Sequence, residues 1–137
     1  MLFPAVLLGH DGSIEIIKHE RQLKVCGKSA LSNKFYEKAS LIDSNRDIIN
    51  FDDIQLEKNH GWFSGFSIFS ERKVEISFQE IKVVEGASLL EVVQKIINCM
   101  KVDEYFWEST GSIESIEKEL LESSDFSHLI EVLSRYL

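Results

Sequence analysis

The fold is decided by the stretch Lys73-Val-Glu-Ile-Ser-Phe-Gln-Glu-Ile-Lys-Val-Val-Glu-Gly-Ala-Ser-Leu-Leu-Glu-Val-Val-Gln-Lys-Ile-Ile-Asn-Cys-Met100, where the apolar period changes from two to about 3.6. Its first part alternates apolar and polar residues, as in a strand with one buried face. After Gly86 one helical stripe collects Leu89, Val92, Val93, Ile96, Ile97 and Met100. Ser88 and Glu91 have the spacing of a capping box. The stretch therefore predicts a strand followed by a helix.

Earlier segments have the patterns of strands and turns. Asp11-Gly12 separates the apolar runs 5–8 and 13–17, which predicts a hairpin. A turn at residues 44–46 separates the runs 39–43 and 47–51, which predicts a second hairpin. Residues 18–32 are too polar for a strand and predict a short helix that is broken or capped near Gly27. The alternation slips near residues 79–80, which predicts a bulge or a strand end there.

Later segments have the patterns of helices. Residues 113–121 predict a short amphipathic helix with Ile113, Ile116, Leu120 and Leu121 on its apolar side. Ser123 or Ser124 is expected to cap a last helix, whose stripe is Phe126, Leu129, Ile130, Leu133 and Tyr136. Residues 1–137 are therefore predicted to form a single α+β domain. A mostly antiparallel sheet comes from the N-terminal two thirds, and the C-terminal helices pack on one face of it.

The composition is that of a globular protein. The chain has 137 residues, 44% of them apolar and 28% charged, which is enough to bury a core without a metal or a disulfide. The apolar start, residues 1–8, is interpreted as a strand rather than a signal peptide, and no apolar run is long enough to span a bilayer. We therefore expect a cytoplasmic protein, with Cys26 and Cys99 as unpaired thiols.

The negative charge is concentrated at one end of the chain. Residues 1–102 carry 14 acidic and 13 basic side chains, whereas residues 103–137 carry nine acidic side chains against Lys118 and Arg135. Most of the net charge of −8 therefore lies in the last quarter. Such a surface disfavours nucleic acid and anionic membranes and attracts cationic partners. The alternative is that these carboxylates are the solvated faces of two helices.

No motif for catalysis, a metal or a cofactor is present. Asp43-x-Asn45-x-Asp47 resembles the opening of a calcium loop, but Ile48 stands where glycine is needed and Ile54 where glutamate is needed, so a hairpin turn is expected. The four histidines are far apart, and nucleotide-binding glycine loops are missing. We predict a protein that is not an enzyme and uses no cofactor.

Two aromatic clusters are candidates for binding. Trp62 and Phe63 lie in a loop between glycines, where Trp62 is either a binding anchor or a lid on the core. Tyr105-Phe-Trp107 lies among carboxylates, so a ring surrounded by negative charge is expected there, although one of its rings can also pack in the core. The predicted partner-binding residues are Trp62, Phe63, Glu104, Tyr105, Trp107, Glu108, Glu114, Glu117 and Glu122.

The order of these features resembles that of a known class of proteins. A small acidic chain with early hairpins, a middle strand ending as in Lys73-Val-Glu-Ile-Ser-Phe78, and helices containing Tyr-Phe-Trp-Glu-Ser is similar to the immunity proteins of bacterial polymorphic toxin systems. These include the partners of contact-dependent inhibition and type VI secretion toxins. The resemblance is of size, charge and element order, and it assigns a role to no residue. It implies a cytoplasmic, non-enzymatic protein that neutralises a cognate toxin by covering its active site or a surface it needs.

Three functional hypotheses follow. In the first, the acidic helical end and its aromatic residues dock on a basic toxin domain such as a nuclease, where they compete with nucleic acid. In the second, the chain is a small enzyme or ligand-binding domain that uses the loop from His60 to Phe66 as a pocket wall. In the third, it is an adaptor that forms a homodimer through an exposed edge strand.

Overall fold

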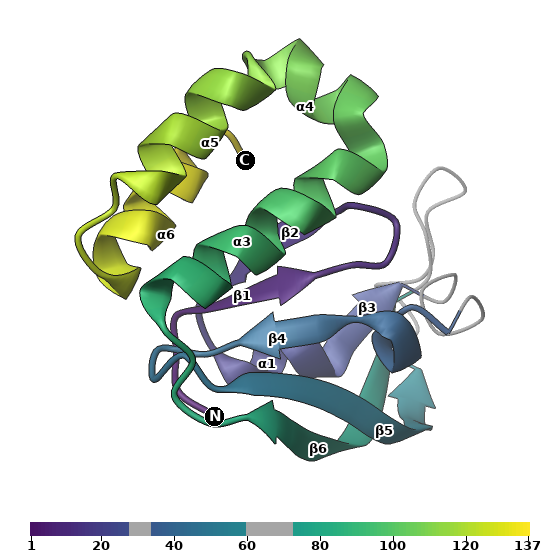
Figure 1. Ribbon diagram of the computed structural model, residues 1–137. Coiled ribbons are helices and arrows are strands. Elements are labelled where there is room, and N and C mark those ends of the chain that lie inside the picture. The colour runs from purple at the N-terminus through teal and green to yellow at the C-terminus, as the bar shows by residue number, and fades with distance from the viewer. Residues whose placement is uncertain (28–33, 60–72) are drawn as a thin grey trace.

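The computed structural model describes residues 1–27, 34–59 and 73–137, which form an antiparallel sheet and a layer of helices (Figure 1). The strands are β1 (Ala5–Leu8), β2 (Ile14–Ile17), β3 (Val25–Gly27), β4 (Ser40–Ile42), β5 (Ile48–Asn59) and β6 (Lys73–Val84). The helices are α1 (Glu20–Lys24), α3 (Leu89–Met100), α4 (Glu104–Thr110), α5 (Ile113–Leu121) and α6 (Phe126–Ser134), with 3-10 turns η1 (Tyr36–Lys38) and η2 (Lys101–Asp103). The predicted α+β class is confirmed.

The sheet has the strand order β2-β1-β4-β5-β6-β3, and every pair in it is antiparallel. Both predicted hairpins, β1–β2 and β4–β5, are confirmed. The prediction of a short helix in residues 18–32 is correct for α1 but wrong beyond Lys24, where the chain enters β3. The chain forms a strand here because Val25 and Cys26 pair with Glu75 and Val74 of β6.

The slip in the alternation of β6 corresponds to a register shift. Asp52 pairs with Gln79 and Gln55 pairs with Ser77, so two residues of β5 lie opposite Phe78. The extra residue is therefore on β5, where Asp53 has a positive φ of 48°. β6 does not end near residues 79–80 but continues to Val84.

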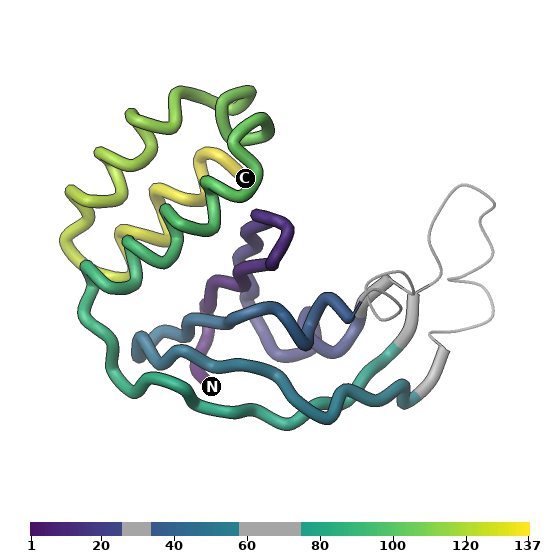
Figure 2. The backbone as a smooth tube through the Cα atoms, turned by 45° about the vertical axis from the view of Figure 1, so that its right-hand side comes forward, coloured from purple at the N-terminus to yellow at the C-terminus, as the bar shows by residue number. Residues whose placement is uncertain are grey.

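The sheet has a hydrophobic core on each face. Val6 and Leu8 of β1 pack with buried side chains of α3, α5 and α6, whereas Ala5 and Leu7 belong to a second cluster on the other face. Figure 2 shows the helical layer above β1, with β5 and β6 curving away beneath it. The C-terminal helices therefore cover one face, as predicted. The short helix α1 contributes Leu23 to the second cluster.

The ends of the helices are fixed by side chains. Ser88 Oγ accepts a hydrogen bond from the Glu91 amide at 3.1 Å, and Glu91 Oε2 accepts one from the Ser88 amide at 2.8 Å. The predicted capping box is thus confirmed. The cap predicted for the last helix is wrong, because Asp125 accepts from the His128 amide at 2.8 Å and is the residue that caps α6. Ser123 instead continues the last turn of α5, where its hydroxyl donates to the Glu119 carbonyl at 3.4 Å.

The segment from Asp43 to Asp47 is a turn that joins three parts of the chain. Asp43 is 1% exposed, and its carboxylate accepts from the amides of Leu2, Asn45 and Asp47 at 3.0, 2.9 and 3.1 Å. Asp47 accepts from the Gly86 amide at 2.8 Å and pairs with Lys82 Nζ at 2.9 Å. The hydrogen bond and charge of Lys82 hold the pKa of Asp47 below its usual range. This turn therefore fixes the β6–α3 junction relative to the N-terminus.

Candidate functional site

The candidate site is the outward surface of α4 and α5, which we call the acidic helical surface and define by Glu104, Glu108, Glu114, Glu117 and Glu122. Two short helices joined by a tight turn form this surface. Asp103 caps α4 by accepting from the Phe106 amide at 3.3 Å. The Gly111 amide donates to the Trp107 carbonyl at 3.2 Å and ends α4. α5 begins two residues later, so the two helices form a continuous corner of the helical layer (Figure 1).

The nine carboxylates of residues 103–137 divide into two groups. Asp103 and Asp125 cap helices, and Glu119 and Glu131 pair with Arg135 at 3.7 and 3.6 Å. Glu119 also accepts from the Tyr136 hydroxyl at 2.9 Å, which raises the pKa of Tyr136. The other five are those of the acidic helical surface, and they make no hydrogen bond or ion pair with any residue that the structure describes. These five are the carboxylates that the sequence assigned to a partner.

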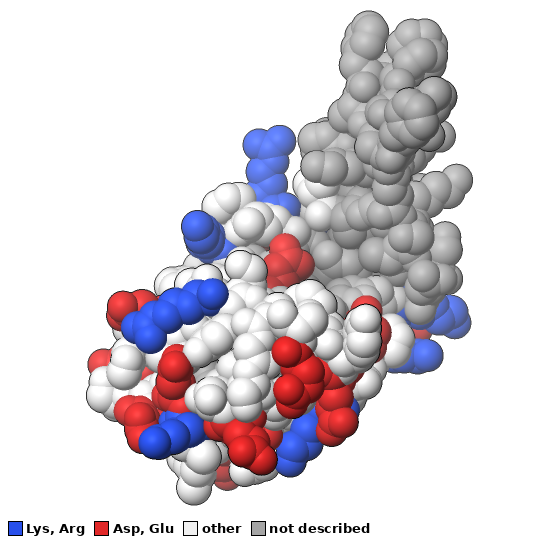
Figure 3. All heavy atoms as spheres, turned by 90° about the horizontal axis from the view of Figure 1, so that it is seen from above, with Lys and Arg blue, Asp and Glu red and all other residues white. Residues whose placement is uncertain are grey.

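Helix geometry places these carboxylates on shared faces. At about 100° per residue, Glu104, Tyr105 and Glu108 fall on one side of α4. Glu114, Glu117 and Leu121 fall within a sector of about 60° on α5. Glu122 follows as the C-cap of α5. Figure 3, which looks down on the helical layer, shows acidic side chains in several groups separated by uncharged atoms, with lysines and arginines beside some of these groups.

An exposed apolar patch lies beside Glu104 and Glu108 of the acidic helical surface. Tyr105 is 89% exposed, Val102 is 60% exposed and Phe106 is 44% exposed. Their spacing of three and four residues places them next to one another on η2 and α4. We call them the Tyr105 patch. An apolar patch with a charged rim is the usual anatomy of a binding surface.

A second apolar feature lies at the far end of α5. Leu89, Leu90, Val93, Leu120, Leu121 and Ser123 line a pocket of about 260 Å³ between α3 and α5. Leu90 and Leu121 are 65% and 53% exposed at its mouth. The prediction that Leu121 lies on the buried side of its helix is wrong, because it is turned by about 100° from Leu120, which takes the core position. Glu117 lies one helical turn before Leu121, and Glu122 directly follows it.

Trp107 is a core residue, and its assignment as a partner-binding residue is wrong. Its side chain is fully buried, and its indole Nε1 donates to the Gly12 carbonyl at 3.3 Å. Consecutive rings on a helix point about 100° apart, so Tyr105 faces outward where Trp107 faces inward. The spacing of seven residues from Met100 is the signal that places Trp107 on the buried side. Trp62 and Phe63 lie outside the described residues, as does the whole loop from His60 to Phe66.

Sequence reasoning missed the exposed Val102, Leu90 and Phe106 as parts of this surface. Leu90 does have a signal, because it lies off the apolar stripe of α3 and is nevertheless a large apolar residue. The position of Val102 depends on the 3-10 turn η2, which links α3 to α4 and has no marker in the sequence. The acidic residues can be predicted from the sequence, because their charge does not depend on packing.

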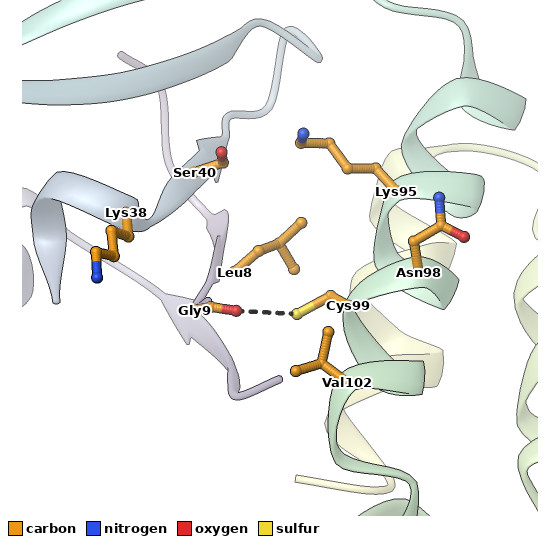
Figure 4. A pocket seen from close by; sticks show the side chains of 8 residues that line it. All are labelled: Leu8, Gly9, Lys38, Ser40, Lys95, Asn98, Cys99 and Val102. Atoms are coloured by element: carbon orange, nitrogen blue, oxygen red, sulfur yellow. Dashed lines mark hydrogen bonds between the residues drawn. The ribbon is translucent and has the colours of Figure 1, made fainter. Parts of the chain in front are cut away.

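A second pocket, of about 290 Å³, lies between α3 and the strands β1 and β4 (Figure 4). Cys99 lines it, and its thiol donates to the Gly9 carbonyl at 3.5 Å. Burial raises the pKa of the Cys99 thiol to about 11, so it is protonated at neutral pH and is a poor nucleophile. Lys95 extends toward Ser40, whereas Lys38 points away from the pocket. The Ser40 hydroxyl donates to Asn50 Oδ1 at 3.0 Å. The polar groups of this pocket therefore do not converge on one point.

Metal chemistry has no support among the described residues, where no group of three or more His, Cys, Asp or Glu side chains is placed to hold an ion. Asp43 and Asp47 direct their oxygens at backbone amides and at Lys82. His128 Nδ1 accepts from the Ser124 amide at 3.2 Å, and the ring of His10 lies 6.0 Å from that of Phe35.

Comparison of the chain with protein-family models, with curated proteins and with solved structures finds no match. In the parts of the chain that the structure describes, no helix has the length and apolar character needed to cross a bilayer.

Proposed function

We propose that this chain is an immunity protein that binds a basic toxin domain, such as a nuclease, and neutralises it. The observation that carries the proposal is the division of the nine C-terminal carboxylates. Four of them stabilise the helices, and the remaining five, on α4 and α5, have no partner among the described residues. Two of these five, Glu104 and Glu108, lie beside Tyr105 on α4. Exposed carboxylates at this density repel one another, and a cationic partner relieves that repulsion.

Charge and apolar contact have different roles in the proposed complex. The carboxylates attract a cationic surface over a distance of about a Debye length and so increase the rate of encounter. Tyr105 supplies a large, rigid apolar contact beside Glu104 and Glu108, which slows dissociation. A nuclease binds polyanionic nucleic acid, so the same carboxylates compete with phosphate groups for its basic residues. Inhibition therefore needs no catalytic group on this chain.

The proposal predicts that the neighbouring gene encodes a secreted protein with a toxic C-terminal domain. The test is binding to that domain, measured by surface plasmon resonance and by inhibition of the toxin's activity. Tyr105→Ala is expected to weaken binding by about 30-fold or more, because it removes the most exposed aromatic side chain of the Tyr105 patch. Leu137→Ala is the matched control, since Leu137 is also apolar and is 49% exposed. It is expected to change the affinity less than about twofold.

Two outcomes contradict the proposal. Failure of the purified chain to bind or inhibit the neighbouring domain removes the assigned function. Tight binding that neither Tyr105→Ala nor the double substitution E104K/E108K weakens assigns the interface to another surface. Thermal unfolding of each variant distinguishes a loss of binding from a loss of fold. Because Tyr105 is 89% exposed, Tyr105→Ala is expected to leave the melting temperature unchanged.

A further inference from the structure

The second half of β6 is an exposed sheet edge. β3 pairs with β6 only at Lys73, Val74 and Glu75, and no other described strand lies on that side of β6. Every residue from Gln79 to Gly86 is exposed. We call residues 79–84 the open edge of β6. Figures 1 and 2 both show this part of β6 at the margin of the molecule, with no described element beyond it.

The open edge carries apolar side chains as well as free backbone groups. Ile81 is 47% exposed and Val83 is 56% exposed. An unpaired edge strand with exposed apolar residues is a template for another strand. Its sequence, Gln79-Glu-Ile-Lys-Val83, places one acidic and one basic residue symmetrically about Ile81.

We infer that the open edge of β6 pairs with the same segment of a second copy of this chain, antiparallel and with the twofold axis at Ile81. A twofold axis perpendicular to the sheet keeps each face of one copy on the same side as that face of the other copy. The residue on the axis therefore faces the same residue of the second copy, and the residues on either side of it pair symmetrically. With the axis at Ile81, Glu80 faces Lys82 of the second copy, and the reverse pair forms as well. Opposite charges at such positions stabilise a strand pair.

The two neighbouring registers are disfavoured by the same charges. An axis at Glu80 sets two carboxylates against each other, and an axis at Lys82 sets two ammonium groups against each other. Lys82 already pairs with Asp47 at 2.9 Å, which holds its side chain in place. An ammonium group has three donors, so Lys82 can keep this contact and also reach Glu80 of the second copy. The pairing joins two sheets into one continuous sheet and covers Ile81 and Val83.

Mass measurement by light scattering or sedimentation over a concentration series up to about 200 µM tests the pairing. The expected result is a species of twice the 15.7 kDa of one chain, which increases with concentration. Ile81→Lys places two like charges on the axis and is expected to give a monomer throughout. Leu137→Lys, at a site of nearly equal exposure, is the control and is expected to leave the dimer intact.

Cysteine crosslinking tests the register. Facing residues of an antiparallel pair have Cα atoms about 4.5–5.5 Å apart, which a disulfide can span. Ile81→Cys is therefore expected to form a disulfide-linked dimer under mild oxidation, and Gln79→Cys is not. A mixture of Gln79→Cys and Val83→Cys chains is expected to link to each other. A wild-type chain that is monomeric throughout the series, a dimer that Ile81→Lys leaves intact, or crosslinking of Gln79→Cys alone overturns the inference.

Discussion

Asp43 is the residue on which three separate segments depend. Its buried carboxylate accepts from amides at the N-terminus, in the β4–β5 turn and at the start of β5. One oxygen serves Asn45 and Asp47, and the other serves Leu2. A buried amide that loses its acceptor costs free energy, so the two oxygens have separable contributions to the stability of the fold.

Substitution at Asp43 separates these contributions. Asp43→Ala leaves three amides without an acceptor and is expected to lower the free energy of unfolding by about 3 kcal/mol. Asp43→Asn keeps one oxygen for Asn45 and Asp47 and loses the contact with Leu2, so about 1 kcal/mol is expected. Urea unfolding of the two variants measures both values. Equal effects of the two substitutions would show that the Leu2 contact dominates.

At the scale of elements, α3 connects the sheet to the helical layer, and its start is fixed by Ser88 and Glu91. Because both capping bonds are present, Ser88→Ala is expected to lower the free energy of unfolding by about 1 kcal/mol. Ser115→Ala is a suitable control, since Ser115 is exposed on α5 and has no hydrogen bond to a described residue. It should be neutral or slightly stabilising, because alanine is the better helix former. Chemical denaturation of both variants measures the free energy of unfolding. An equal change at the two sites would contradict a stabilising role of the Ser88 cap.

An element can be predicted from the sequence when the interactions that form it are between residues close together in the chain. The start of α3, the two hairpins and the helical stripes depend on spacings of a few residues, and the sequence alone predicts them. β3 depends on pairing with a strand about 50 residues away in the chain, which no local pattern encodes. The choice of Asp125 over Ser123 or Ser124 as a cap depends on where α5 ends, and Ser123 is still engaged in its last turn.

The same distinction between local sequence patterns and tertiary contacts applies to the candidate site. The five free carboxylates were predictable, because charge excess needs no packing information. An aromatic residue among charges predicts a surface position for Trp107, but its spacing of seven residues from Met100 and the corner between α3 and α4 place it in the core. Leu120 and Leu121 are consecutive apolar residues of α5, and only Leu120 faces the core. Contact between elements, rather than composition, decides which apolar residue is left exposed.

At the scale of the whole molecule, the charge is placed asymmetrically, and this asymmetry predicts how the proposed complex forms. Five Glu→Gln substitutions on the acidic helical surface change the net charge from −8 to −3. They are expected to lower the association rate with the basic domain by about tenfold or more at low ionic strength, and to leave the dissociation rate nearly unchanged. The matched control neutralises five exposed carboxylates elsewhere, namely Glu15, Glu37, Asp52, Glu57 and Glu85, and reaches the same net charge.

Stopped-flow association at about 0.02 M and about 0.5 M salt measures the effect of both variants. If the position of the charge matters, the control retains most of the wild-type rate at low salt, and all three proteins converge at high salt because the charges are screened. If both variants slow association equally, net charge alone attracts the partner, and the acidic helical surface has no special role. An association rate of the wild-type protein that is independent of salt would remove electrostatic attraction altogether and leave the Tyr105 patch and the Leu90–Leu121 pocket as the basis of an apolar interface.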